Sequence, residues 1–161
     1  MAALPPFQAL LDDHGRAIWR FLRASLGEHD AADCYQETVL AALRAYPDLR
    51  RVTNLKGWLF TIAHHKALDH HRRVARRRQS DREPPEQPMV DEPTDESLWA
   101  AVHRLPPKQR AAVLHRFVAD LPYADIATLL GCSEPAARQN VRAGLAALRA
   151  DLAVATEGAT P

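Results

Sequence analysis

Residues 122–149 read PYADIATLLGCSEPAARQNVRAGLAALR, and their pattern sets the architecture expected for the second half of the chain. A short amphipathic segment ends at Gly131, a residue that readily takes the positive φ of a tight turn. Ser133 can cap the helix that follows, and Ala127 is small where two helices must cross closely. This spacing predicts a helix-turn-helix motif.

The second helix of such a motif lies in the DNA major groove, where its N-terminal side chains reach base edges. Arginine can donate two hydrogen bonds to guanine, glutamine can form two with adenine, and glutamate can accept a hydrogen bond from cytosine. The alternative is a helical hairpin that only packs, and Gly144 counts against the motif because glycine within a helix costs about 1 kcal/mol. The basic outer face favours DNA binding, and the predicted contact residues are Ser133, Glu134, Ala136, Arg138, Gln139 and Arg142.

Helical spacing continues on both sides of the turn. A helix is expected to start at Thr94 or Asp95 and to carry Leu98 on its apolar side. The pair Pro106–Pro107 would break it, and Pro107 suits the first turn of another helix. The last helix is expected to reach Leu152. These elements predict a helical domain over 98–152, followed by a disordered tail over 153–161.

The first half of the chain also has helical spacing. Apolar residues predict a helix from Phe7 to Leu26, which Gly27 would end. A second helix is expected to begin with Asp30 as its cap, to carry Leu43 among its core residues and to end at Pro47. Because no strand alternation extends beyond a few residues, the expected fold class is all-α.

A third helix, capped by Thr53 or Asn54, is expected to carry Leu68 on its apolar side and to end near Arg78. Its residues 62–78, IAHHKALDHHRRVARRR, contain six basic residues and four of the eight histidines. A helix face with this density of positive charge would contact the phosphates of a nucleic acid, and the binding would weaken as salt is added. The alternatives are a solvated charged face, or a metal site that lacks the Cys or carboxylate to complete it, built from His64, His65, His70 and His71.

Three aromatic residues, Tyr46, Trp58 and Phe60, precede this basic segment. Aromatic side chains beside a basic helix can stack on unpaired bases. The sequence WLFTIA around Trp58 also fits a core position, so both interpretations of that residue stay open.

Charge divides the chain into three parts. Residues 1–78 carry a net charge of +5, residues 79–98 carry −6, and residues 99–161 carry +2. The strip 79–97, QSDREPPEQPMVDEPTDES, has four prolines and few apolar residues, so it predicts a flexible acidic linker. This layout indicates two small helical domains, 1–78 and 98–152, that bind one polyanionic target.

Several classes of protein are excluded by what the sequence lacks. No apolar run approaches the roughly 20 residues needed to span a bilayer, so no membrane insertion is expected. The start, MAALPPFQALLDDHGR, lacks the basic region of a secretory signal, which favours reduced cytosolic thiols at Cys34 and Cys132. Because no Gly-rich phosphate loop, nucleophile elbow or metal-ligand set is present, we expect neither an enzyme nor a metal or cofactor.

Three segments, in this order, resemble the extracytoplasmic-function (ECF) sigma factors of bacterial RNA polymerase, a branch of the sigma-70 family. Residues 30–40, DAADCYQETVL, resemble the family's acidic helix. Residues 58–73, WLFTIAHHKALDHHRR, resemble its promoter-melting helix. Residues 105–149, which begin LPPKQR and continue through ADIATLLGCS, resemble its second-domain helix-turn-helix. The resemblance covers roughly 7–78 and 98–152.

The resemblance implies a sigma factor that directs core polymerase to promoters and helps to melt them. Its implied partners are the β′ clamp helices and β flap of the polymerase, and promoter DNA. The second domain would contact the −35 element as duplex. The acidic helix would dock on the clamp helices through Asp33, Gln36, Glu37 and Leu40. The −10 element would be contacted by Asn54, Lys56, Trp58, His64, His65, Lys66, Arg72 and Arg73.

The resemblance also implies a bacterial cytoplasmic location and a further partner, an anti-sigma factor. The alternative function is a helix-turn-helix regulator that binds DNA without docking on polymerase. The intact Gln36-Glu37 segment argues against that alternative.

Overall fold

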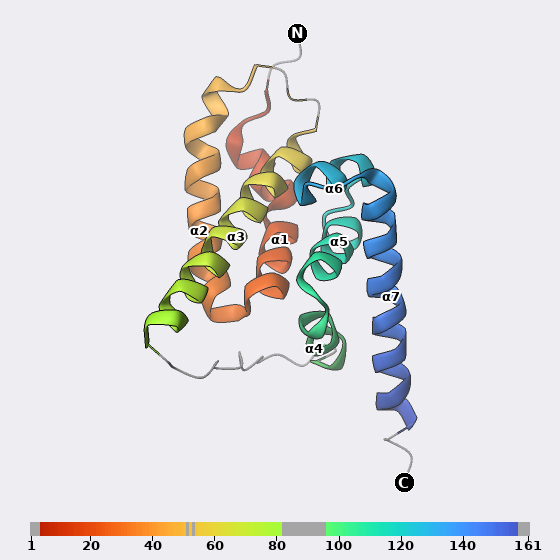
Figure 1. The fold of residues 1–161 in the computed structure, drawn as a ribbon. Helices are drawn as coiled ribbons and strands as arrows, with labels where there is room; N and C mark the ends of the chain where they lie inside the picture. Colours follow the sequence, from red (N-terminus) through yellow and green to blue (C-terminus); the bar gives the residue numbers. More distant parts are fainter. Residues whose placement is uncertain (1–3, 51, 53, 82–95, 158–161) are drawn as a thin grey trace. The chain divides into compact units, whose positions relative to one another are not determined.

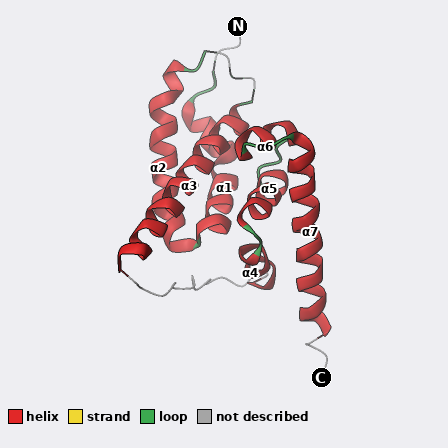
Figure 2. Ribbon diagram, in the orientation of Figure 1, coloured by secondary structure: helices red, strands yellow, loops and turns green. Residues whose placement is uncertain are grey.

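The computed structural model describes residues 4–50, 52, 54–81 and 96–157 (Figure 1). The chain divides into two compact units, Met1–Met89 and Val90–Pro161. Every regular element in the described ranges is a helix, which confirms the expected all-α class (Figure 2). In chain order the elements are α1 Phe7–Leu26, α2 Glu28–Ala45, the 3₁₀ helix η1 Tyr46–Asp48, α3 Leu55–Asp81, α4 Glu96–Arg104, α5 Pro107–Phe117, α6 Tyr123–Leu130 and α7 Glu134–Glu157.

The first unit is a bundle in which α1, α2 and α3 pack pairwise around an aromatic and aliphatic core. Phe21 of α1 and Phe60 of α3 meet edge to face, with ring centroids 5.6 Å apart. Such a pair adds about 0.5–1.5 kcal/mol to the burial of its area. The core between these helices also contains Ile18, Leu22 and Leu59, each at most 1% exposed.

The inward face of α2 is built from small side chains, at Ala31, Cys34, Thr38 and Ala42. The Thr38 hydroxyl donates to the Cys34 carbonyl at 2.7 Å, so its polar group is satisfied within the helix. This buried stripe turns Leu43 to solvent, where it is 48% exposed. The expected place of Leu43 on the packed side of its helix is therefore wrong. Leu68 of α3 was also expected on the apolar side and is 36% exposed.

The second unit packs α4, α5 and α6 against the long helix α7. Gly131 follows α6 with φ 62° and ψ 39°, the left-handed conformation expected of the turn glycine. The Ser133 hydroxyl accepts the Ala136 N–H at 3.3 Å, as expected of the cap of α7. Ile126 and Val141 then meet the rest of the core nearly fully buried. The predicted helix-turn-helix geometry is thus present.

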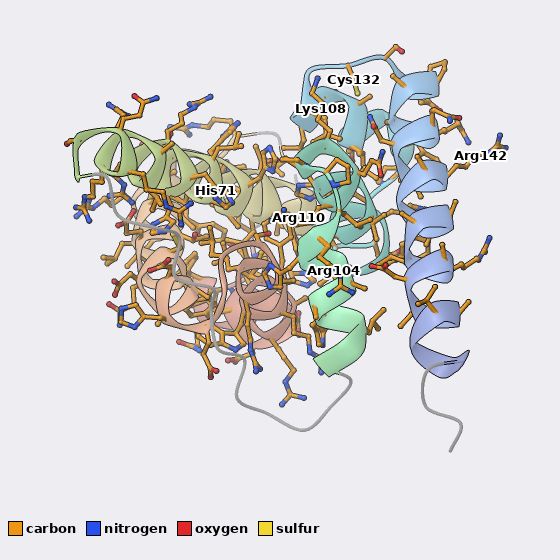
Figure 3. The ribbon with its side chains drawn as sticks, turned by 60° about the horizontal axis from the view of Figure 1, so that its bottom comes forward. His71, Arg104, Lys108, Arg110, Cys132 and Arg142 are labelled. Carbon is orange, nitrogen blue, oxygen red and sulfur yellow. The ribbon has the colours of Figure 1, made fainter. Side chains whose placement is uncertain are left out.

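Arginines tie α4 to the remainder of the second unit. The Arg110 guanidinium donates to the Leu105 carbonyl at 3.2 Å, just after the end of α4, where a cation favours the helix dipole. Arg104 donates to the Asp151 carboxylate through Nε at 3.2 Å and Nη2 at 3.1 Å. Figure 3 labels both arginines, Arg104 on α4 and Arg110 on α5. The Asp151 pair joins α4 to the C-terminal half of α7.

Several helix ends differ from the sequence expectation. Helix α2 begins at Glu28, directly after Gly27 and ahead of the expected cap Asp30. The Asn54 side chain does cap α3, accepting the Gly57 N–H at 2.8 Å, whereas Thr53 lies outside the described residues.

Helices α3 and α7 are longer than expected. They run to Asp81 and Glu157, past the expected ends at Arg78 and Leu152. The sequence contains no helix-breaking residue between those points and Pro84 or Gly158. Part of the predicted linker 79–97 and part of the predicted tail 153–161 are therefore helical, because α4 also begins at Glu96. The remainder of both segments lies outside the described residues.

Gly144 has a packing role that helix propensity alone does not show. It is buried in α7, and a Cβ placed there would lie 2.6 Å from Cγ2 of Val113 and 3.4 Å from the Gln109 carbonyl oxygen. Real Cβ atoms essentially never approach a neighbour that closely. Glycine at this position therefore allows α5 and α7 to cross closely.

We predict that Gly144→Ala lowers the free energy of unfolding by about 1–3 kcal/mol, the usual cost of overpacking a core. Propensity alone would give the opposite sign, since alanine is the better helix former by about 1 kcal/mol. Chemical denaturation of the full chain measures the effect. The same substitution should cost little in a Val113→Ala background, and an equal loss in both backgrounds would contradict the close crossing.

Candidate nucleic-acid and polymerase interface

The recognition helix α7 presents most of its predicted DNA contacts to solvent. Arg138, Gln139 and Arg142 are exposed, and Arg142 projects away from α7 (Figure 3). Ala136 is half-buried, and Ser133 is exposed while its hydroxyl caps the helix. Glu134 accepts a hydrogen bond from Arg138 one turn later, so two predicted base contacts pair with each other in the free protein.

Tyr123, which the sequence analysis did not select, lies beneath this helix-turn-helix surface. The Arg138 guanidinium carbon is 4.4 Å from the centroid of its ring, and that of Arg116 is 5.1 Å away. Distances of this size are typical of cation–π contacts. Helical periodicity carries no signal for this cluster, because the three residues come from three different helices.

Helix α3 presents a positive surface in the first unit. His65, Arg72 and Arg73 are exposed along it, as the predicted −10 set requires. Lys56 and Lys66 are half-buried. The Asn54 side chain is engaged in capping α3. The exposed run of arginines continues beyond the predicted set to Arg76, Arg77 and Arg78.

Trp58 takes an intermediate position between the two interpretations left open by the sequence. Its ring is half-buried, with its centroid 6.1 Å from that of Tyr46. Tyr46 in turn packs edge to face on Phe7 and donates through its hydroxyl to the Pro5 carbonyl. Trp58 thus borders the core while part of its side chain remains at the surface.

His64 does not belong to the surface set. Its side chain lies inside the bundle and is 5% exposed, so it is not available to contact DNA in this fold. Burial lowers the pKa of the His64 imidazole from 6.5 to about 4, and the neighbouring His65 acts in the same direction. Its assignment to the −10 contacts is therefore corrected: this imidazole is a neutral core group near pH 7.

The predicted docking face of α2 is largely exposed to solvent. Asp33, Gln36 and Leu40 are exposed, and Leu40 retains 51% of its surface. Leu43, one turn further along the same side, extends the apolar part of this face. We call Asp33, Gln36, Leu40 and Leu43 the α2 stripe.

Glu37 differs from the α2 stripe because it faces α3. Its carboxylate lies 3.9 Å from Lys66 Nζ and 3.6 Å from Arg73 Nη2. A further contact between the two helices places His70 Nε2 3.1 Å from an Asp30 carboxylate oxygen. The predicted docking residue Glu37 and two predicted DNA contacts therefore form one cluster. Partly exposed pairs of this kind contribute at most about 1 kcal/mol each.

Neither cysteine forms a disulfide. Cys34 is buried in α2. Burial, with the nearby Glu37 carboxylate adding to it, raises the pKa of the Cys34 thiol to about 11. A thiol of this kind is unreactive near neutral pH because the thiolate is the nucleophile. Cys132 is half-buried in the turn before α7.

Two negative findings apply to the described part of the chain. No group of three or more His, Cys, Asp or Glu side chains in it could hold a metal ion. Within the same residues, no helix combines the length and the apolar character that crossing a membrane requires.

Comparison with known proteins accounts for both units. Residues 10–78 match the family Sigma-70 region 2, and residues 95–148 match the family Sigma-70, region 4. SigL of Mycobacterium tuberculosis, an ECF RNA polymerase sigma factor, is 33% identical over 157 residues, which cover 90% of this chain and 88% of SigL. The chain belongs to the ECF sigma factors of RNA polymerase.

A further relative agrees with this membership, and two solved structures share the fold. The sigma factor SigE of Mycolicibacterium smegmatis is 33% identical over 94% of this chain, which spans 63% of the length of SigE. Among solved structures, the sigma factor RpoE from Bartonella quintana, in complex with the anti-sigma factor NepR, matches with a TM-score of 0.85 at 23% identity, covering 94% of this chain and 99% of that one. CnrH, in complex with the cytosolic domain of CnrY, matches with a TM-score of 0.66 at 24% identity, covering 92% and 88%.

The buried His64 predicts that acid lowers the stability of this sigma factor. The unfolded chain takes up a proton on this imidazole below about pH 6.5, whereas the folded chain does so only near pH 4. The contribution of neutral His64 to stability is thus complete above pH 6.5 and is lost as the pH falls toward 4. The loss should reach about 1 kcal/mol by pH 5.5.

We predict that His64→Gln makes the free energy of unfolding fall less between pH 7 and pH 5.5 than it does in the wild-type protein. Denaturant titrations at the two pH values measure the difference. His65→Gln, which removes the exposed neighbouring imidazole, serves as the matched control and should keep most of the acid response. A wild-type response in His64→Gln would show that His64 does not titrate as a buried group.

Proposed function

We propose that this sigma factor docks on core RNA polymerase through the α2 stripe and binds promoter DNA at two places. The positive surface of α3 would contact the −10 element, and the N-terminal half of α7 would contact the −35 element as duplex. The single observation that carries the proposal is the division of α2. Its small side chains fix one side of the helix to the bundle, while Leu40 and Leu43 remain in solvent on another.

Exposed leucines next to Asp33 and Gln36 suit a protein partner better than DNA, because apolar contacts with a polar rim are typical of protein interfaces. The partner proposed for this surface is the pair of clamp helices of the polymerase β′ subunit. A regulator without polymerase docking would have no use for the α2 stripe, so that alternative is not favoured.

The DNA contacts are proposed from exposure and charge. Arg138, Gln139 and Arg142 are exposed on the recognition helix, and the arginines of α3 are exposed in the first unit. Phosphate contacts from such groups give affinity and salt dependence, whereas contacts with base edges give specificity. With the buried His64 removed, the side chains proposed to contact the −10 element are Asn54, Lys56, Trp58, His65, Lys66, Arg72 and Arg73.

Further parts of the proposal follow from the family. We place the protein in the bacterial cytoplasm, together with core polymerase, and assign it no chemistry of its own. Two structures of the same fold were solved with an anti-sigma factor or a partner's cytosolic domain bound. An anti-sigma factor is therefore proposed as a regulatory partner of this chain as well.

Run-off transcription tests the function directly. Purified protein would be added to core polymerase on fragmented genomic DNA, without any inhibitor, and the transcript starts would be mapped. Initiation at discrete sites is expected, and the recovered promoters supply probes for the experiments below. Absence of initiation at any discrete site would overturn the proposal.

We predict that Arg138→Ala combined with Arg142→Ala abolishes initiation at these promoters while polymerase binding persists. Each lost base contact should cost about 1–3 kcal/mol, or about fivefold to 150-fold in promoter affinity. Initiation and polymerase binding would be measured on the same preparations. Arg149→Ala removes an exposed arginine further along the same helix and is the control. Equal loss of polymerase binding would contradict separate binding surfaces.

We predict that Leu40→Ala combined with Leu43→Ala weakens binding to core polymerase at least about tenfold, because residues that anchor the centre of an interface each cost more than about 1 kcal/mol when truncated. Both side chains are about half exposed, so the free energy of unfolding should change little. This pair is a cleaner test than Glu37, whose removal would also release Lys66 and Arg73.

Val154→Ala, at a 70% exposed aliphatic position on α7, is the control for the docking experiment. Fluorescence anisotropy with labelled protein gives the affinity of each variant. Unchanged affinity of the double variant would show that the docking surface lies elsewhere.

A further inference from the structure

Tyr123 occupies a central position in the helix-turn-helix. It is the first residue of α6, and its ring is half-buried. The guanidinium groups of Arg116, from α5, and Arg138, from α7, both lie over this ring, at 5.1 Å and 4.4 Å from its centroid. One aromatic side chain therefore connects α5, α6 and α7.

The two arginines are held to different degrees. Arg116 donates through Nη1 to the Leu121 carbonyl at 3.1 Å, lies 4.0 Å from the Asp120 carboxylate, and has a side chain only 35% exposed. Arg138 has a side chain 54% exposed, and besides the ring it contacts the Glu134 carboxylate. Arg116 thus belongs to the scaffold around the ring, whereas Arg138 extends from the ring toward solvent.

The two contacts of Arg138 use different parts of its guanidinium group. A cation–π contact uses the flat face, whereas hydrogen bonds to a carboxylate or to guanine O6 and N7 use the N–H edges. Contact with a base is therefore compatible with the Tyr123 ring. Glu134 accepts from Nη2, one of the three guanidinium nitrogens, so a base contact that uses the same N–H must displace it.

We infer that Tyr123 is a positioning residue for DNA recognition, holding the Arg138 side chain in the orientation in which it contacts a base. This inference rests on the proposed function, in which α7 contacts the −35 duplex. An arginine side chain carries about 2 kcal/mol of rotamer entropy, so orienting it before binding lowers the cost of each contact. Tyr123 gives Arg138 this orientation without itself reaching the DNA.

A double-mutant cycle on the full-length protein with core polymerase tests the inference. The probe is the strongest promoter duplex recovered by run-off transcription, with its −35 element either intact or substituted one base pair at a time. Tyr123→Leu should weaken binding about threefold to tenfold and reduce discrimination at the base pair that Arg138→Ala also affects. Tyr123→Phe keeps the ring and should bind like the wild-type protein.

The effect of Tyr123→Leu should vanish in an Arg138→Ala background, because the tyrosine acts through that arginine. An equal loss in both backgrounds, or no loss in either, overturns the inference. If Tyr123→Leu does not fold, phenylalanines of increasing fluorination at position 123 replace it, since they weaken the ring's attraction for a cation at nearly constant size. Affinity should then fall with each fluorine, and a constant affinity would overturn the inference.

The controls separate this inference from the proposed function. If Arg138→Ala itself leaves promoter binding unchanged, the assignment of α7 to the −35 element fails, and the positioning role fails with it. If Arg138→Ala weakens binding and both tests at position 123 leave it unchanged, only the role of Tyr123 is rejected.

Discussion

The arrangement of both units depends on helices that approach one another closely, and small side chains make that approach possible. In the first unit the buried face of α2 is formed by Ala31, Cys34, Thr38 and Ala42. In the second unit Gly144 allows α5 and α7 to cross where any Cβ would meet Val113. Because protein interiors are packed as tightly as organic crystals, such crossings fix helix positions within narrow limits. The exposed faces of α2 and α7 take their orientation from these buried ones.

Much of this architecture could be predicted from local signals. Gly131 and Ser133 have strong conformational preferences, and the turn and cap appear where those preferences put them. Gly27 and Pro107 likewise mark helix boundaries correctly. The ends of α3 and α7 were misjudged because those segments lack any residue that stops a helix. A charged or alanine-rich tail can continue a helix without adding to the core, and hydrophobic periodicity does not detect it.

The errors at the candidate interface have a different origin. Helix α2 carries two stripes at helical spacing, one of small residues and one of leucines. Spacing does not show which stripe faces the core, and the small residues do, so Leu43 faces solvent. His64 falls in line with the buried residues Phe60 and Ala67, a signal that could have indicated its burial. The contact of Tyr123 with Arg138 was beyond reach, since it depends on the angle between α6 and α7. Sequence patterns therefore predicted the helices better than they predicted the burial and contacts of the side chains on them.

The leucines of α2 have a consequence for the protein when it is alone. Leu40 and Leu43 keep about half of their surface in water, so the hydrophobic effect favours covering them by any apolar surface that fits. A copy without a partner would therefore be stabilised by any protein that covers these two side chains. Its abundance in a cell would then depend on the supply of proteins that cover Leu40 and Leu43. The lifetime of the chain would report how much of it is bound to a partner.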